Sequence, residues 1–319
     1  MNDTKRLLWG YIDADGEFVV KPQYDGAADF HEGLAVVKLD WRSGYIDRTG
    51  AVAIGLQFQS ADNFSDGIAR VMVNDKWGFI TPAGQYAINP DFDKASEFRD
   101  GLARVTVDGK DGYINRSGTF AVKPDYEFIG DFHEGLAWVK LDGKYGYVDT
   151  EGRRVIEPFF ENAGDFCDGL ASVMKDDKYG FIDLEGRFII DPVYDFASGF
   201  ADGVARVKAD GRWSYINTSG NPTDEPAATP PPTVFHDGMA PARSGDKEGY
   251  INEAGDFVIE PKYYQAEPFC EGYARVRTGK TKWSFIDTSG ALAFKGRYAQ
   301  ASDFHEGLAR VLVEVTSDE

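Results

Sequence analysis

One repeated pattern constrains the fold of this chain more than any other feature. The hexapeptide F-x-[DE]-G-x-A occurs nine times, with 34 or 35 residues between successive glycines. A second pattern, [YF]-[IV]-[DNT]-x-x-G, also occurs nine times in a fixed position relative to the first. Two linked patterns at one period identify a chain of tandem units. The nine glycines of the first pattern are Gly33, Gly67, Gly101, Gly135, Gly169, Gly203, Gly238, Gly272 and Gly307.

Each unit reads as three short strands. In the L-A-x-V segment, as at 102–105, side chains alternate between two faces. A turn such as Asp142-Gly143 follows, and Asp-Gly between β-prone runs predicts a tight hairpin because both residues tolerate positive φ. The second strand resembles 145–149, and the third resembles 18–22. The sequence therefore predicts an all-β protein, with one domain over 1–319 built from nine tandem ~34-residue three-stranded repeats.

The phase of the repeats predicts how the two ends meet. The chain begins at a second strand, at Trp9, and ends on a first strand at 308–311. Pairing these segments would complete one unit and remove two exposed strand edges. We therefore expect a closed propeller-like ring in which the C-terminal strand completes the first unit, and the alternative is an open β-solenoid-like array.

A proline-rich run, NPTDEPAATPPPTV, occupies 221–234, where the seventh unit should have its third strand. Proline cannot donate the N–H that a central strand needs, so we expect this run to replace the strand with an edge loop. The alternative is a docking segment for a proline-recognising partner.

The chain resembles the WG-repeat family through the aromatic-Gly pair that opens the second strand. The motifs that carry this resemblance start at Trp9, Trp77, Tyr145 and Tyr179, and the P-x-[YF] and F-x-[DE]-G-L-A segments match as well. The resemblance covers nearly the whole chain. It implies a β-rich protein with an interaction role and no agreed catalytic residues. The pair departs from the pattern at Ser43, Asp111 and Glu248, which replace the aromatic, and at Ser214 and Ser284, which replace the glycine.

An acid precedes each glycine of the first pattern in all nine units. We expect these carboxylates to accept backbone N–H bonds at the turn, and an arginine four residues later offers a second partner, as for Asp66 and Arg70. The functional alternative is a circle of carboxylates that binds a cation or a basic partner.

The second position of the same pattern holds every histidine and cysteine of the chain. We call it the slot, and its residues are His31, Ser65, Arg99, His133, Cys167, Ala201, His236, Cys270 and His305. A closed ring would place His31, His236, Cys270 and His305 in successive units, and these residue types are preferred zinc ligands. They are weak metal candidates, because close ligand pairs such as C-x-x-C are absent and an exposed, variable slot explains the pattern equally well. A pH-sensitive histidine contact is a further alternative.

Charge and composition narrow the function. The formal net charge of −19 argues against nucleic acid and against anionic membrane surfaces. The N-terminus has no signal-peptide pattern and no apolar run spans a bilayer, so we expect a cytoplasmic protein. No nucleophile with a base, phosphate loop or unique carboxylate pair is visible, so we expect no enzyme and no cofactor.

We therefore expect a non-enzymatic protein- or peptide-binding scaffold for a neutral or basic partner. Arg99, His133 and Cys167 of the slot are its candidate contacts. The alternatives are a ligand- or metal-binding β-ring that uses the slot, and a structural spacer.

Overall fold

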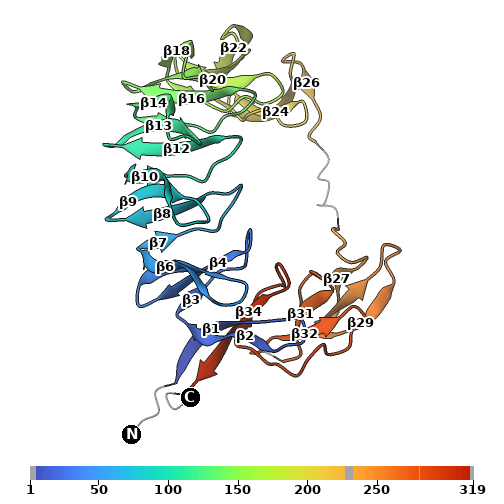
Figure 1. Ribbon diagram of the computed structural model, residues 1–319. Coiled ribbons are helices and arrows are strands. Elements are labelled where there is room, and N and C mark those ends of the chain that lie inside the picture. The colour runs from blue at the N-terminus through green and yellow to red at the C-terminus, as the bar shows by residue number, and fades with distance from the viewer. Residues whose placement is uncertain (1–4, 227–232, 280, 317–319) are drawn as a thin grey trace. The chain divides into compact units, whose positions relative to one another are not determined.

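The described residues contain strands and no helix. The structure is a computed structural model that describes residues 5–226, 233–279 and 281–316 (Figure 1). The all-β prediction is confirmed: these ranges hold β1–β34 in nine antiparallel sheets. Within the same ranges, no helix is long and apolar enough to cross a membrane.

The chain divides into two compact parts, called unit 1 and unit 2, each of which contains several of the repeated units. Each part is described by itself. Unit 1 comprises Met1–Pro90 and Pro231–Glu319, and unit 2 comprises Asp91–Pro230. The strands of unit 1 are β1 (Arg6–Ile12), β2 (Phe18–Tyr24), β3 (Gly26–Ala27), β4 (Leu34–Leu39), β5 (Arg42–Asp47), β6 (Val52–Phe58), β7 (Ser60–Ala61), β8 (Ala69–Val73), β9 (Lys76–Ile80), β10 (Tyr86–Phe92), β27 (Ala240–Ser244), β28 (Lys247–Ile251), β29 (Phe257–Tyr263), β30 (Gln265–Ala266), β31 (Tyr273–Arg277), β32 (Ser284–Asp287), β33 (Gln300–Ala301) and β34 (Ala309–Val315). Strand β10 begins in unit 1 and ends in unit 2.

Unit 2 carries the remaining strands in the same order of elements. They are β11 (Lys94–Ala95), β12 (Leu102–Val107), β13 (Lys110–Asn115), β14 (Phe120–Tyr126), β15 (Phe128–Ile129), β16 (Leu136–Leu141), β17 (Lys144–Asp149), β18 (Arg154–Phe160), β19 (Asn162–Ala163), β20 (Ala171–Lys175), β21 (Lys178–Ile182), β22 (Phe188–Tyr194), β23 (Phe196–Ala197), β24 (Val204–Ala209), β25 (Arg212–Asn217) and β26 (Pro222–Thr223).

A typical sheet contains the three predicted strands and a fourth, which the sequence pattern did not predict. In the order β15-β16-β17-β18, the first member has two residues and pairs with the L-A strand through Ile129 and Val139. The predicted turn between the next two strands is confirmed, because Asp142 and Gly143 both adopt positive φ, at 49° and 76°. The short strand was missed because two residues carry too little alternation to be recognised.

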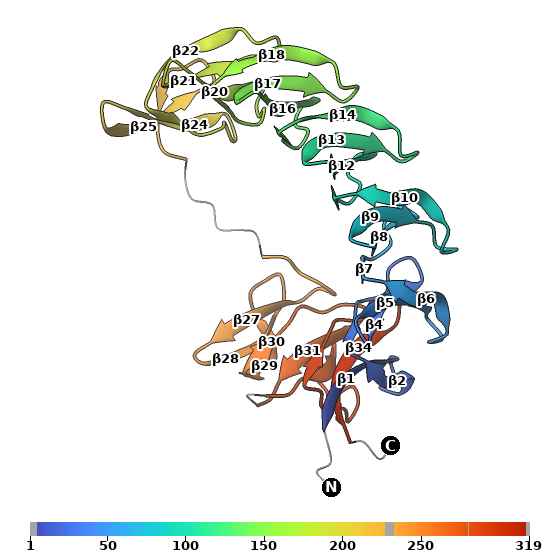
Figure 2. The same ribbon diagram turned by 90° about the vertical axis from the view of Figure 1, so that its left-hand side faces the viewer.

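The two ends of the chain build one sheet of unit 1, with strand order β2-β1-β34-β33. β1 and β34 are antiparallel and pair over seven positions, from Arg6 opposite Val315 to Ile12 opposite Ala309 (Figures 1 and 2). The prediction that the C-terminal strand completes the first unit is confirmed. Closure of all nine units into a ring stays a prediction.

Equivalent aromatic pairs recur in the core from one sheet to another. Tyr147 and Phe166, which come from successive units, pack with ring centroids 4.8 Å apart, and Tyr250 and Phe269 repeat this contact. The alanine of the hexapeptide is buried in every unit, as Ala171 is, which leaves room for these rings. Each pair buries the large apolar area that holds one sheet against the next.

The glycine of the aromatic-Gly pair is required by the third strand. A Cβ on Gly180 would lie 2.6 Å from the carbonyl oxygen of Ile190, on the adjacent strand β22. Where serine replaces this glycine, the third strand is shortened or lost: Ser214 pairs into a sheet that ends at the two-residue β26, and Ser284 lies on β32 at the edge of a three-stranded sheet. The serine substitutions therefore coincide with irregular units.

The proline-rich run is described at both ends only. Residues 222–223 form β26, which pairs with Tyr215 and Ile216, so the prediction that a loop replaces the whole strand is wrong at those two positions. Residues 224–226 and 233–234 form no strand, and 227–232 lie outside the described residues.

Candidate functional site

Each slot residue directly precedes a two-residue turn. His31 donates its N–H to the carbonyl of Leu34 at 2.9 Å, and Leu34 donates back to His31 at 3.1 Å. Glu32 and Gly33 between them adopt positive φ of 54° and 79°. All nine slot residues form the same bridge, so they stand at equivalent points of their turns.

In six turns the acid reaches forward to the turn of the next unit. The backbone N–H of Gly169 donates to the carboxylate of Glu134 at 3.0 Å, and that of Gly203 donates to Asp168 at 2.8 Å. Equivalent bonds join Glu32 to Gly67, Asp237 to Gly272, Glu271 to Gly307 and Glu306 to Gly33. The predicted role as acceptors of backbone N–H is confirmed, but the donor belongs to the following unit.

Two of the arginines four residues later, Arg275 and Arg310, bind carboxylates outside these turns. Arg275 binds Asp303 at 2.6 Å and stands over the ring of Trp283 at 5.2 Å. Arg310 likewise binds Asp29 at 2.9 Å and stacks on Trp9. At these two positions the expected partner was wrong, because the arginine side chain lies over the aromatic residue of the second strand rather than at the turn.

The structure brings two of the four weak metal candidates together. The rings of His31 and His305 stack with centroids 6.1 Å apart and an interplanar angle of 24°. The nearest acid is Asp29, whose carboxylate lies 4.0 Å from Nε2 of His305. This contact follows directly from the pairing of β1 with β34.

Cys270 and His236 do not join that pair. The Cys270 thiol donates to the carbonyl oxygen of Phe304 at 3.1 Å, and burial, with Asp303 adding to the effect, raises the pKa of the thiol. A raised thiol pKa disfavours the thiolate that binds metal. His236 is exposed. Among the described residues, no group of three or more His, Cys, Asp or Glu side chains could hold a metal ion.

The candidate partner contacts Arg99, His133 and Cys167 are all exposed and come from successive turns of unit 2. His133 lies 3.8 Å from the carboxylate of Asp165 through its Nε2 atom. Their side chains are accessible to a partner.

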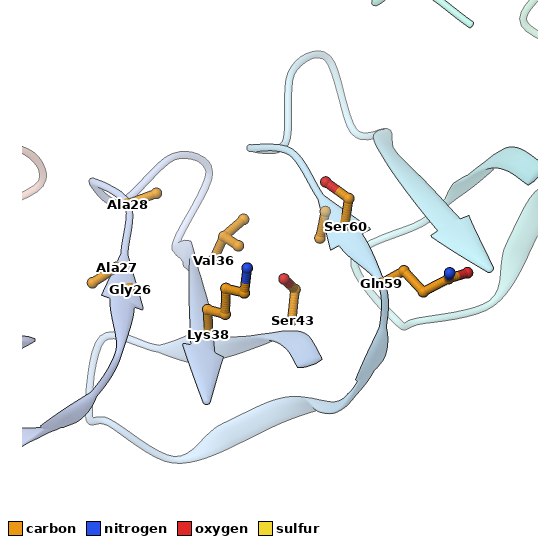
Figure 3. Close-up of a pocket in the computed structure, with 9 residues that line it drawn as sticks. Gly26, Ala27, Ala28, Val36, Lys38, Ser43, Gln59 and Ser60 are labelled. Atoms are coloured by element: carbon orange, nitrogen blue, oxygen red, sulfur yellow. The ribbon is translucent and has the colours of Figure 1, made fainter. Parts of the chain in front are cut away.

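A hollow in unit 1 was missed by the sequence patterns, although the substitution that creates it was noted. It has a volume of about 270 Å³ and opens beside Ser43, where six of the other units carry an aromatic ring (Figure 3). Its walls come from β3, β4, β5 and β7, and the lining residues are Gly26, Ala27, Ala28, Val36, Lys38, Ser43, Gln59, Ser60 and Ala61.

The comparisons identify the repeat. The model of the WG containing repeat matches eight segments: 9–40, 44–77, 77–110, 112–145, 145–179, 179–213, 249–281 and 283–314. Residues 214–248, which include the proline-rich run, have no match. A search of the curated proteins finds no match.

Several solved structures are similar at low identity. A eukaryotic initiation factor is 10% identical with a TM-score of 0.41, and the alignment covers 98% of both chains. BamB from Moraxella catarrhalis is 12% identical with a TM-score of 0.32 and 97% coverage of both chains. Hsv2 from Kluyveromyces lactis is 9% identical with a TM-score of 0.33, over 72% of this chain and 71% of that one. Similarity at this level carries no information on function.

Proposed function

The chain belongs to the WG containing repeat family, and we propose that it is a non-enzymatic scaffold that binds a protein or peptide. Repeated aromatic pairs and carboxylate hydrogen bonds hold its units together. Units linked in this way present the same surface positions again and again on a rigid frame. The partner is a neutral or basic chain, since the net charge of −19 repels acidic ones.

Exposed apolar side chains on the third strands carry this proposal. In unit 2, Val155 and Phe159 on β18 are 44% and 47% exposed, and Ile189 and Val193 at the equivalent positions of β22 are 51% and 56% exposed. Single exposed apolar residues are ordinary, whereas grouped ones mark interaction surfaces. These four residues, which we call the third-strand patch, lie at equivalent positions of successive units.

The third-strand patch lies on the exposed side of its strands, and of its members Phe159 packs on the buried Phe160 with ring centroids 4.0 Å apart. The buried partners on the same strands, Ile156 and Ile190, already supply the core contacts. Exposed β-branched and aromatic side chains on a strand offer contact area to an extended peptide or to a flat protein surface.

A peptide-display selection against the full chain tests the proposal. We expect enriched peptides, and we expect their affinity to fall by about tenfold or more when the four patch residues are changed to serine. The matched control changes Phe128 and Phe196, exposed apolar residues of the short strands β15 and β23, to serine and should leave binding unchanged. Selection that enriches no peptide on the wild-type chain would reject the scaffold function.

A further inference from the structure

The hollow beside Ser43 is best understood by comparing equivalent rows of side chains across the sheets. In the four-stranded sheets, one residue of the L-A strand lies between a residue of the short strand and the aromatic position of the pair. In unit 2, Lys140 lies between Phe128 and Tyr145. Its Nζ atom stands 5.9 Å and 5.4 Å from the centres of these two rings. The lysine is therefore flanked by aromatic rings on both sides.

A second row of unit 2 has the same arrangement. Lys208 lies between Phe196 and Trp213, with its Nζ atom 5.6 Å from the indole. The two rings are 5.4 Å apart at their centroids. Lysine at this position thus goes together with aromatic neighbours on the same face of the sheet.

The row of Lys38 keeps the lysine and lacks both rings. Its neighbours are Gly26 on β3 and Ser43 on β5, two of the smallest residues available. The space that rings occupy in the Lys140 and Lys208 rows is here the hollow of about 270 Å³ (Figure 3). Within the described residues, Ser43 is buried and makes no side-chain hydrogen bond that would fill this space.

The other two units that lack the aromatic compensate for its loss. Asp111 accepts a hydrogen bond from the hydroxyl of Thr106 at 2.8 Å. Glu248 binds the guanidinium of Arg243 at 2.7 Å and accepts the backbone N–H of Ala266 at 2.7 Å. Ser43 has no comparable partners, so the loss of the ring leaves a vacancy at this position.

A second observation on the same hairpin indicates a binding role. Trp41 is 84% exposed and occupies the second turn position with φ of 66°. The equivalent position is glycine at Gly109, Gly143 and Gly211. A bulky residue with positive φ is strained, and such strain persists where it serves a function. The Nζ atom of Lys38 lies 5.4 Å from this indole, and Lys38 also lines the hollow.

We propose that the hollow between Gly26, Lys38 and Ser43 binds an aromatic side chain of a partner peptide, with Trp41 contacting the neighbouring residue of that peptide. The incoming ring takes the place that Tyr145 and Trp213 fill in their own rows, under the lysine ammonium, which attracts the face of a ring. This inference rests on the proposed scaffold function and names one of its binding sites.

The size and charge of the site decide between possible occupants. At about 270 Å³ the hollow is smaller than pockets for drug-sized ligands, and it fits one ring with its chain outside. Trp41 beside it offers contact to a continuing chain, as an interface anchor does. A second copy of this protein, which would insert its own Trp41, is disfavoured because each copy carries a net charge of −19.

The test is a titration of the isotope-labelled full chain with N-acetyl-tryptophanamide, followed by NMR, with N-acetyl-leucinamide as the aliphatic control. We expect saturable shifts at the amides of Gly26, Lys38 and Ser43 with the aromatic probe alone. The variant Ser43→Trp fills the hollow as Trp213 fills its row, and it should weaken binding by about tenfold or more. Lys38→Met, which places the native residue of the Met72 row here, should weaken it about threefold.

Each result of these titrations either supports or overturns the aromatic-binding site. Absent shifts, or equal binding by wild type and Ser43→Trp, would overturn the aromatic site. The scaffold function would still stand if display peptides bind the third-strand patch, so the two failures are distinguishable. A concentration-dependent dimer that Trp41→Ala abolishes would show that the occupant is a second copy, and would overturn the assignment to a partner peptide.

Discussion

The carboxylate of Glu306 accepts the backbone N–H of Gly33 at 3.0 Å, across 273 positions of sequence. The same bond joins successive turns elsewhere in the chain, as between Glu134 and Gly169. At Glu306 it links the last turn of the chain to the first. One interaction therefore serves both to join neighbouring units and to fasten the two termini.

Removing this carboxylate should loosen the terminal sheet. We expect Glu306→Ala to lower the free energy of unfolding by about 1 kcal/mol, since the backbone N–H of Gly33 loses its acceptor. Native-state hydrogen exchange should speed up at the amides of β1 and β34. In the control Glu134→Ala, which breaks the same bond inside unit 2, these amides should keep their wild-type protection. Unchanged exchange in Glu306→Ala would show that the bond does not fasten the ends.

The aromatic-Gly pair should not tolerate a side chain at its glycine. Gly180→Ala places a Cβ 2.6 Å from the carbonyl oxygen of Ile190 and should cost about 1–3 kcal/mol, with loss of protection along β22. Gly55→Ala is the control, because a Cβ there meets nothing within 4 Å, and its effect should stay within about 0.5 kcal/mol. Denaturant titration of both variants measures the difference, and equal values would refute the steric explanation.

We expect Trp41 to lower the free energy of unfolding, because it occupies a turn position with positive φ. We expect Trp41→Gly to raise the free energy of unfolding by about 1 kcal/mol, since glycine adopts positive φ without strain. The reverse change, Gly109→Trp, should destabilise the corresponding turn of unit 2. Thermal unfolding of both variants is the measurement. A destabilised Trp41→Gly variant would mean that the indole contributes more through its contacts than its backbone costs.

Acid should weaken the turns that follow the second strands. A hydrogen bond from the Thr49 hydroxyl, together with backbone N–H groups, holds the pKa of the Asp47 carboxyl below its usual value, and Ser289 acts in the same way on Asp287. A lowered folded-state pKa stabilises the protein above the carboxyl's unfolded value of about 4, and this contribution disappears as the pH falls through the folded value.

The double variant Asp47→Asn/Asp287→Asn tests this dependence. Asparagine already accepts the same bonds at Asn115, where the Ser117 hydroxyl lies 2.7 Å from Oδ1, so the turns should form. Denaturation midpoints measured between pH 7 and pH 3 should fall less steeply in the double variant than in the wild type. Parallel curves would show that these two carboxylates contribute nothing to acid lability.

Much of the architecture was predictable because it is local. Paired residues such as Asp142-Gly143 fix a turn by their own φ preferences, and the Asp149 carboxylate accepts the backbone N–H of Glu151 only two residues on. The phase of the repeats also predicted that β34 would pair with β1, because this pairing satisfies the unpaired strand edges at both ends of the chain. The two-residue strands, by contrast, leave no readable pattern in the sequence.

The candidate site was only partly predictable, because residues in different units meet through register. The slot was visible as a column of histidines and cysteines, yet the fold stacks His31 on His305 and turns the Cys270 thiol to a backbone carbonyl. Ser43 was visible in the sequence as a departure from the pattern, whereas the hollow beside it was not. The sequence alone determined the period, the turns and the class of fold, because these depend on neighbouring residues. Tertiary structure decided that the carboxylates bridge units and that Gly26, Lys38 and Ser43 share one row, because cross-strand pairing sets which side chains face a common space.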